Sequence, residues 1–250
     1  MTVKNYLNIN VYEATQKRLK FIFDEFSNIL VAFSGGKDSG LMLNLTLEYA
    51  KSINQLDKVA VYFLDYEAQY KQTIDYVTNT FNKLPKQVKK YWVCLPMKVP
   101  CTTSMFQNFW VPWEEKSRKI WVRQQPKKNY VININNAEFD YDDWDYTVQE
   151  NFCTWFSKNN ENSCVLVGIR ATESLNRQAA ITSKQKINKF KNKEYITKKE
   201  GSIAVYPIYD WNVSDIWVAN CKFNYSYNSL YDLFYKAGLS MNKCGLHLLF

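Results

Sequence analysis

The chain has a single histidine, His247, and this shortage excludes much of the usual hydrolase chemistry. A metalloprotease of the HExxH type needs two histidines on one helix, and a Ser/His/Asp triad needs a histidine as its base. With one histidine near the last residue, the sequence argues against both. Any catalysis should rest on other side chains or on the backbone.

The sequence has six cysteines, but it lacks cysteine pairs with the spacing of metal ligands. They form no CxxC motif and no regular spacing, so neither a zinc ribbon nor an iron–sulfur cluster has its usual ligands. We expect reduced thiols, no zinc and no cluster. The six are Cys94, Cys101, Cys153, Cys164, Cys221 and Cys244.

No stretch approaches the roughly 20 apolar residues that span a bilayer. The first 26 residues lack the apolar core of a signal peptide, because Asp24 and Glu25 interrupt their most apolar part. The sequence therefore predicts a cytoplasmic protein without membrane association.

What is present is the composition of a packed domain. The 250 residues are 46% hydrophobic and 16% aromatic, which favours one large folded unit over a disordered chain. The net charge of +8 suits a polyanionic partner, but no nucleic-acid-binding motif accompanies it. We expect a basic solvated surface, with nucleic acid, a protein partner and oligomerisation left open.

Short apolar runs alternate with helical patterns along the chain. Short, nearly uniformly apolar strands between helices predict a parallel sheet covered on both faces. The expected fold is α/β, doubly wound, with a mainly parallel five-stranded sheet and an aromatic-rich insertion after the third strand. The strands are expected at residues 29–33, 59–64, 88–95, 164–169 and 203–208.

Two irregular stretches have two possible roles each. Trp110, Trp113 and Trp121 of the insertion could form an aromatic wall for a substrate base or pack in the interior, and packing is favoured. Residues 183–201, with seven lysines, could form a lid over an anionic substrate or a solvated loop, and the loop is favoured.

The loop after the first predicted strand holds the clearest signal. Three of the seven glycines fall within VAFSGGKDSG, residues 31–40. A strand that leads through SGGKDS into a helix places unpaired backbone N–H groups at a helix N-terminus, where phosphate oxygens bind. Glycines permit close approach, the serines add donors and Lys37 adds a positive charge.

Asp38 needs a separate explanation, because a carboxylate beside phosphates is unfavourable unless a cation lies between them. We hypothesise that Asp38 contacts a magnesium ion. The spacing excludes the two better-known phosphate loops, since neither GxxxxGK[ST] nor GxGxxG occurs. Because ligands of parallel sheets bind beyond the carboxyl ends of the strands, the segments after residues 33, 64 and 169 should converge on one crevice.

Several motifs of the sequence together resemble those of a known family. SGGKDS after an apolar strand is similar to the signature of the PP-loop ATP pyrophosphatases and their relatives, the adenine nucleotide α-hydrolase-like group that includes the PAPS reductases. FLDYEAQY (63–70), GIRATESLNR (168–177) and YPIYDWNVSDIW (206–217) resemble further motifs of that group, in the same order. Within this group, the sequence most resembles the subgroup of the immunoglobulin-binding regulator A proteins and their phage-borne relatives. Trp211 and Trp217, in the last of these motifs, are expected to pack in the core.

The resemblance implies an adenine nucleotide, ATP or PAPS, with adenosine near Asp65 and cleavage beside the α-phosphorus. Glu173 and Ser174 belong to the implied nucleotide site. The implied phosphate-binding residues are Ser34, Gly35, Gly36, Lys37, Asp38 and Ser39.

The residues themselves suggest a second anion site. Arg170, Ser174 and Arg177 are spaced i, i+4 and i+7, so on a helix they would share one face at the rim of the crevice. Two guanidinium groups there could hold a sulfate or phosphate. Alternatively, Glu173 pairs with one of the arginines on the surface. We favour the anion site over the surface ion pair. The catalytic candidates are Lys37, Asp38, Arg170 and Arg177.

Three reactions remain open. The intact SGGKDS loop favours a magnesium-dependent reaction at ATP, in which Lys37 and magnesium stabilise departing pyrophosphate while an unidentified oxyanion or sulfur acceptor is adenylylated. The sequence Cys244-Gly245-Leu246-His247 is similar to the reductases' C-terminal motif, so a thiol-dependent PAPS reductase that uses Cys244 is an alternative. A nucleotide-binding regulator without turnover is the third.

The last seven residues differ from the related pattern. Lys243 stands where the reductases have Glu, and a one-base deletion after its codon would convert the subgroup's usual continuation into CGLHLLF. We hypothesise that residues 244–250 are a frameshift tail of a truncated chain, which an in-frame continuation one base away in the gene would confirm.

Overall fold

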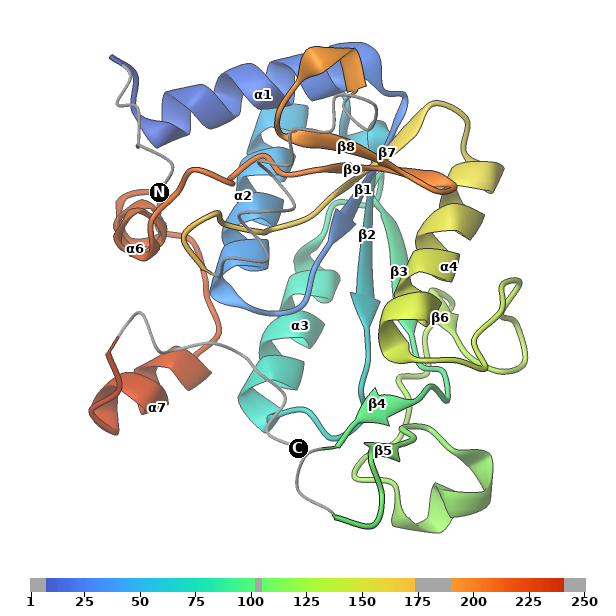
Figure 1. Ribbon diagram of the computed structural model, residues 1–250. Helices are drawn as coiled ribbons and strands as arrows, with labels where there is room; N and C mark the ends of the chain where they lie inside the picture. The colour runs from blue at the N-terminus through green and yellow to red at the C-terminus, as the bar shows by residue number, and fades with distance from the viewer. Residues whose placement is uncertain (1–7, 102–104, 174–189, 241–250) are drawn as a thin grey trace.

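The structure is a computed structural model, and it describes residues 8–101, 105–173 and 190–240. Its centre is a seven-stranded sheet with the order β6-β3-β2-β1-β7-β9-β8 (Figure 1). All neighbouring strands are parallel except β8 and β9, which pair antiparallel. The strands are β1 (Asn28–Ala32), β2 (Val59–Leu64), β3 (Lys89–Val93), β6 (Val131–Ile132), β7 (Ser163–Leu166), β8 (Ile196–Lys199) and β9 (Ser202–Val205).

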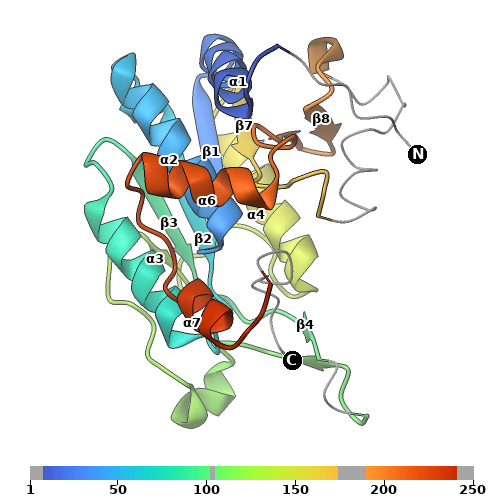
Figure 2. The same cartoon turned by 90° about the vertical axis from the view of Figure 1, so that its left-hand side faces the viewer.

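Helices cover both faces of this sheet. The views agree that α1, α2 and α3 lie on one face and α4 on the opposite face (Figures 1 and 2). The helices are α1 (Val11–Glu25), α2 (Lys37–Ser52), α3 (Lys71–Lys83), α4 (Asp145–Asn159), α6 (Val213–Lys222) and α7 (Leu230–Lys236), with short 3-10 helices η1 (Leu56–Lys58), η2 (Glu115–Ile120) and η4 (Phe190–Asn192). Within the described ranges, no helix is both long and apolar enough to cross a membrane.

The expected doubly wound, mainly parallel α/β fold is confirmed, and all five predicted strands are present. The sheet has two more strands than the five expected. Strand β6 is only two residues long, and β8 has the sequence ITKK with both lysines exposed, so neither shows the apolar run of a central strand. The sequence pattern therefore detects the buried centre of the sheet and misses its two edges.

The topology explains where a ligand can bind. From β1 the chain passes through α2 to β2 on one side, whereas β7, the other neighbour of β1, is reached through α4 on the opposite face. The connections at the carboxyl ends of β1 and β7 therefore diverge, and this reversal of strand order creates a crevice. The loop that contains SGGKDS leaves β1 at this point.

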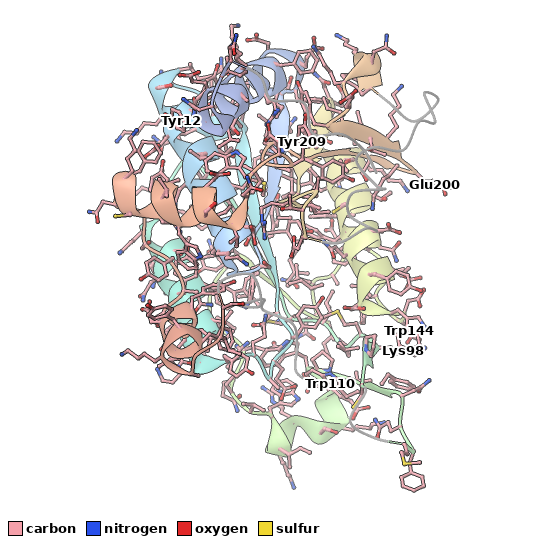
Figure 3. The ribbon with its side chains drawn as sticks, turned by 60° about the vertical axis from the view of Figure 1, so that its left-hand side comes forward. Tyr12, Lys98, Trp110, Trp144, Glu200 and Tyr209 are labelled. Atoms are coloured by element: carbon pink, nitrogen blue, oxygen red, sulfur yellow. The ribbon has the colours of Figure 1, made fainter. Side chains whose placement is uncertain are left out.

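The insertion between β3 and α4 folds against the same end of the sheet. It contains the short hairpin β4 (Val99–Pro100) and β5 (Phe109–Trp110). Lys98 lies beside Trp144 at the start of α4, where the Lys98 N–H donates to the Asp143 carbonyl at 2.8 Å (Figure 3). This link fixes the N-terminal end of α4, which forms one wall of the crevice.

Candidate functional site

The backbone between β1 and α2 turns sharply at two glycines. Gly35 has φ +75°, a conformation that L side chains rarely adopt, and a Cβ atom there would lie 2.8 Å from the Val77 Cγ2 atom. Gly36 is the N-cap of α2 in an extended conformation, and no side chain caps the helix there. The first turn of α2 thus offers backbone donors and a partial positive charge, as the sequence predicts.

The two serines of the loop brace it from inside. Their hydroxyl oxygens, Ser34 Oγ and Ser39 Oγ, lie 3.0 Å apart, and the Ser34 N–H donates to Ser39 Oγ at 3.2 Å. Ser39 Oγ in turn donates to the Gly36 carbonyl at 3.2 Å. In this arrangement the serines shape the loop and hold its hydroxyl groups in one cluster.

Three charged side chains meet beside the loop. The Asp38 carboxylate accepts a hydrogen bond from Arg170 Nε and lies 3.2 Å from Lys37 Nζ. Lys37 and Arg170 are each only 5% exposed, so the group has little contact with solvent. Two cations facing one carboxylate leave a net positive charge at the N-terminus of α2, which favours an anion.

The structure brings Arg170 to the loop by a different route from the expected helix. Residues 167–170 are irregular and residues 171–173 form a turn, so Arg170 is not part of a helix. Gly168 lies against the first turn of α2, where an added Cβ would be 3.1 Å from the Ser39 N and Cα atoms. Ser174 and Arg177, the other two residues of the expected face, lie outside the described residues.

Two residues, one in α7 and one just before it, also hold the loop. The Lys37 N–H donates to the Tyr231 hydroxyl at 3.1 Å, and Lys37 Nζ is 5.3 Å from the centre of the Tyr231 ring. Asn228 is fully buried and donates to the Gly35 carbonyl at 3.1 Å. Neither residue belongs to a recognisable motif, so only the fold reveals these contacts.

A cavity of about 480 Å³ opens over the loop, within the range typical of small-molecule sites. It extends from the loop across the sheet to α4 and to the β8–β9 hairpin, where Lys199 pairs with Glu150 at 3.0 Å. Of the predicted site residues, Ser34, Gly36, Lys37, Asp38, Ser39 and Glu173 line this cavity. Its other lining residues include Tyr62, Tyr66, Gln69, Tyr146, Gln149, Glu150, Cys153, Gly168, Lys199, Tyr206 and Tyr231.

Asp65 lies outside that lining, in a closed network at the carboxyl end of β2. Its side chain is fully buried, accepts from Trp92 Nε1 at 2.6 Å and forms an ion pair with Arg123. Trp113 Nε1 donates to the Asp65 carbonyl at 2.7 Å, and the Trp113 N–H donates to Glu67 Oε2 at 2.7 Å. Asp65 and Glu67 therefore hold the insertion in place.

The predicted packing role of the insertion tryptophans agrees with this network. Trp113 is completely buried, and its ring meets the Trp121 ring edge to face at 5.2 Å between centres. None of Trp110, Trp113 and Trp121 is among the residues that line the cavity. Trp211 is likewise buried, and its Nε1 atom donates to Thr15 Oγ1 at 2.9 Å, whereas Trp217 is half-buried.

The lysine-rich stretch is only partly described. Residues 183–189 lie outside the described residues, and the rest forms η4 and the β8–β9 hairpin. Lys199, the last residue of β8, lines the cavity and so places one positive charge of this stretch at its rim.

Cysteine chemistry in the cavity is limited by burial. Cys153 lines the cavity, and burial raises the pKa of its thiol to about 11. About one molecule in ten thousand would then carry the thiolate at pH 7. Burial and the neighbouring Asp65 carboxylate also raise the pKa of the Cys94 thiol well above its usual value. Cys244 lies outside the described residues.

Asp38 already faces two cations in the structure. One carboxylate oxygen accepts from Arg170 Nε and the other lies 3.2 Å from Lys37 Nζ, and each oxygen keeps a further lone pair. No cluster of three His, Cys, Asp or Glu side chains suited to a metal occurs among the residues described here. The assignment of Asp38 to magnesium stays a prediction.

The fold and the site together define a doubly wound α/β domain with a glycine loop and a candidate anion site at its switch point. The sequence model of the phosphoadenosine phosphosulfate reductase domain matches residues 28–237. The chain therefore belongs to the phosphoadenosine phosphosulfate reductase domain family, as the four sequence motifs indicated.

One curated relative covers nearly the whole chain. The uncharacterized protein YbdN of Escherichia coli K12 is 37% identical over 247 residues, which include 94% of this chain. The aligned part is 57% of YbdN, so the chain spans little more than half the length of this relative.

Solved structures support the fold. The FMN adenylyltransferase of Candida glabrata, in complex with FMN and the ATP analogue AMPCPP, has a TM-score of 0.50 at 14% identity and covers 91% of this chain and 64% of its own. Yeast FAD synthetase in complex with FAD has a TM-score of 0.50 at 16% identity, with 92% and 65% covered. At these identities the similarity establishes the fold alone.

Proposed function

We propose that this domain binds an adenine nucleotide and acts at the anhydride of its α-phosphate, most simply by adenylyl transfer from ATP. The observation that carries the proposal is the position of Lys37. Lys37 and Gly36, the N-cap of α2, line a 480 Å³ cavity at the switch point of the sheet. Membership of the reductase-domain family supports the same class of ligand.

The shape of the cavity suggests how the nucleotide lies. The phosphates would occupy the loop end, beside Ser34, Gly36 and Ser39, where backbone and hydroxyl donors cluster. The base would lie on the apolar surface of the sheet toward α4. Asp65 would then support the site from behind, by fixing the loop after β2, because its carboxylate is enclosed by Trp92 and Arg123.

The positive charges beside the loop suit a reaction in which a negatively charged group departs from the α-phosphorus. In adenylyl transfer an acceptor atom bonds to the α-phosphorus while the bond between that phosphorus and the bridging oxygen breaks, and its electron pair departs with pyrophosphate. Lys37 and the first turn of α2 would stabilise the charge on that leaving group. Arg170, through its ion pair with Asp38, would keep the Asp38 carboxylate away from the phosphates.

The thiol-dependent alternative needs a nucleophilic thiolate. Within the described part of the chain, the cysteine at the cavity is Cys153, whose raised pKa keeps it protonated near neutral pH. Because the SGGKDS loop is intact, adenylyl transfer is our first proposal. Reduction of PAPS by Cys244, and nucleotide binding without turnover, are the outcomes against which it is tested.

The decisive experiment combines binding and product analysis. Purified protein is titrated with ATP and with PAPS, then incubated with ATP and magnesium in one arm and with PAPS and a dithiol in the other. Pyrophosphate formed together with an adenylylated acceptor, or together with AMP when water is the acceptor, supports adenylyl transfer. PAP and sulfite would replace it with the reductase, and binding without products in either arm would replace it with a regulator.

A matched pair of variants ties the result to the loop. Lys37→Ala should weaken ATP binding about 10–100-fold, because it removes a charge-assisted contact to phosphate. Lys71→Ala is the control: Lys71 also begins a helix after a strand, but its side chain is 82% exposed and pairs with Asp75. Unchanged affinity in Lys37→Ala would show that the nucleotide site is elsewhere.

A further inference from the structure

A second pocket, of about 460 Å³, lies at the edge of the sheet and shares no lining residue with the cavity over the SGGKDS loop. It is lined by the edge strand β6, by the segment that leads into this strand, and by Arg118 of η2 with nearby Trp121 (Figure 1). The outer backbone edge of β6 is already closed. The Val131 carbonyl accepts from Asn136 Nδ2 at 2.9 Å, and the Val131 N–H donates to the Lys128 carbonyl at 3.2 Å. A ligand here would therefore meet side chains and would not add a strand.

The charges around this pocket have one dominant sign. Arg118, Lys127 and Lys128 supply three positive charges, and none of the described residues that line the pocket is Asp or Glu. Residues 114–136, which contain the pocket, have six Lys or Arg and two Glu, a net +4 of the chain's +8. This concentration of charge favours a polyanion. The other polar groups of the lining are the side-chain amides of Gln124, Gln125, Asn129, Asn133 and Asn136.

Trp121 adds a fixed aromatic surface to the pocket. Its Nε1 atom donates to the Glu114 carbonyl at 3.1 Å, which holds the ring in place. The Arg118 guanidinium lies over this ring, 5.3 Å from its centre. Arg118 also pairs with Glu115 at 3.4 Å, but both side chains are exposed, so this ion pair is weak. An indole and a guanidinium plane beside lysines are the groups on which unstacked nucleobases are held.

We propose that this second pocket binds single-stranded nucleic acid. Lys127 and Lys128 would contact phosphates, and one base would stack on Trp121 or on the guanidinium plane of Arg118. The side-chain amides would meet the polar edge of that base. A duplex fits less well, because its bases are stacked on one another and do not reach a ring inside a pocket. An inorganic anion would use the lysines and leave the aromatic surface without a contact.

Fluorescence anisotropy with labelled oligonucleotides of about 12 nucleotides tests the proposal on the full chain. Single strands should bind about 10-fold more tightly than a duplex of the same sequence, which is the effect of stacking one base. RNA and DNA strands are both measured. Excess ATP should leave the binding unchanged, because the two cavities have no residue in common.

A double variant and its matched control test the lysines. Lys127→Ala with Lys128→Ala removes two phosphate contacts, so single-strand affinity should fall about 10-fold and its salt dependence should weaken by about 1.4 in the slope of log K against log salt. The control is Lys17→Ala with Lys51→Ala. These lysines are exposed on α1 and α2, outside the pocket, and their removal changes the net charge equally. Affinity in the control should stay within about 2-fold of the parent value.

Arg118→Lys separates stacking from charge. The variant keeps the positive charge and loses the guanidinium plane, so single-strand affinity should fall about 5-fold while the salt dependence stays the same. The Arg118 side chain is 63% exposed, so thermal stability should not change.

Three results would overturn the proposal. The first is a parent protein that binds no single strand, or two double variants that weaken binding equally, which would indicate a basic surface without a site. The second is equal affinity for duplex and single strand with no effect of Arg118→Lys, which would indicate contact with the phosphate backbone alone. The third is complete displacement of the oligonucleotide by inorganic tripolyphosphate at equal phosphate concentration, which would indicate a site for small anions.

Discussion

Two aspartates follow neighbouring strands of this sheet, and each pairs with an arginine, yet their surroundings differ. Asp38 lies in the first turn of the helix that follows β1, at the edge of an open cavity, and pairs with Arg170. Asp65 lies just beyond β2, is sealed under the insertion and pairs with Arg123. Position after a strand is therefore not sufficient to assign a role, because the segment that folds over the residue decides whether a ligand can reach it.

Breaking the sealed ion pair of Asp65 and Arg123 should lower the free energy of unfolding most. Removing one partner of a buried ion pair leaves an uncompensated charge, so Asp65→Ala should lower the free energy of unfolding by about 3–5 kcal/mol. Asp38→Ala should cost less, about 1–2 kcal/mol, because Asp38 lines the cavity and water can enter the space that its carboxylate leaves. Urea unfolding monitored by tryptophan fluorescence measures both. Equal losses would remove the distinction between the open and the sealed pair.

The glycine turn beside the open pair gives the next largest effect. Gly35→Ala combines a positive φ with a contact to Val77, so we expect a loss of about 2–4 kcal/mol and of ATP binding. Gly238→Ala is the matched control. Gly238 has φ +81° but no atom within 4 Å of an added Cβ, so backbone strain alone should cost about 1 kcal/mol. A similar loss in both would mean that close packing at the loop contributes nothing.

Substitution of Tyr231 tests whether its hydroxyl occupies part of the open site in the free protein. Its hydroxyl accepts from the Lys37 N–H, a donor that a phosphate oxygen would use. Tyr231→Phe should destabilise the free protein by about 0.5–1.5 kcal/mol and raise ATP affinity several-fold, since no internal bond must be broken. Tyr227→Phe, whose hydroxyl bonds to Asp232 at 2.9 Å, should leave affinity unchanged. Weaker binding in Tyr231→Phe would instead make its hydroxyl part of the ligand site.

Cysteine alkylation gives the smallest effect and compares access to the two regions directly. Exposed Cys221 should react first, and Cys153, in the cavity, should react slowly at pH 7. Because only the thiolate reacts, and burial raises the pKa of Cys153 to about 11, its rate should increase with pH through pH 10. ATP should slow it. Cys94, beside sealed Asp65, should react only on unfolding, as mass spectrometry of the alkylated peptides can show.

The sequence was sufficient for the buried strands and for the loop. Five apolar runs predicted five strands, and the edge strands β6 and β8 escaped because one has two residues and the other is largely polar. The SGGKDS loop was predicted as a strand-to-helix turn whose glycines permit close approach, and the structure places Gly35 and Gly36 at this turn. These features are local, so backbone geometry and side-chain periodicity encode them directly.

The other parts of the candidate site depend on contacts between distant segments. Tyr231 and Asn228 reach the loop from α7 and from the residue two positions before it, and Gln149 meets Tyr62 across the gap between α4 and β2. No local pattern marks these residues. Their roles arise only when the sheet aligns their elements.

The sequence by itself determined that a parallel sheet would form and that a helix N-terminus with Lys37 would face its carboxyl end. The tertiary structure alone decided that Asp38 borders an open cavity while Asp65 is enclosed by the insertion. The physical reason is that alternation and glycine geometry act over a few residues. Burial of a charge, in contrast, depends on which distant segment packs over it.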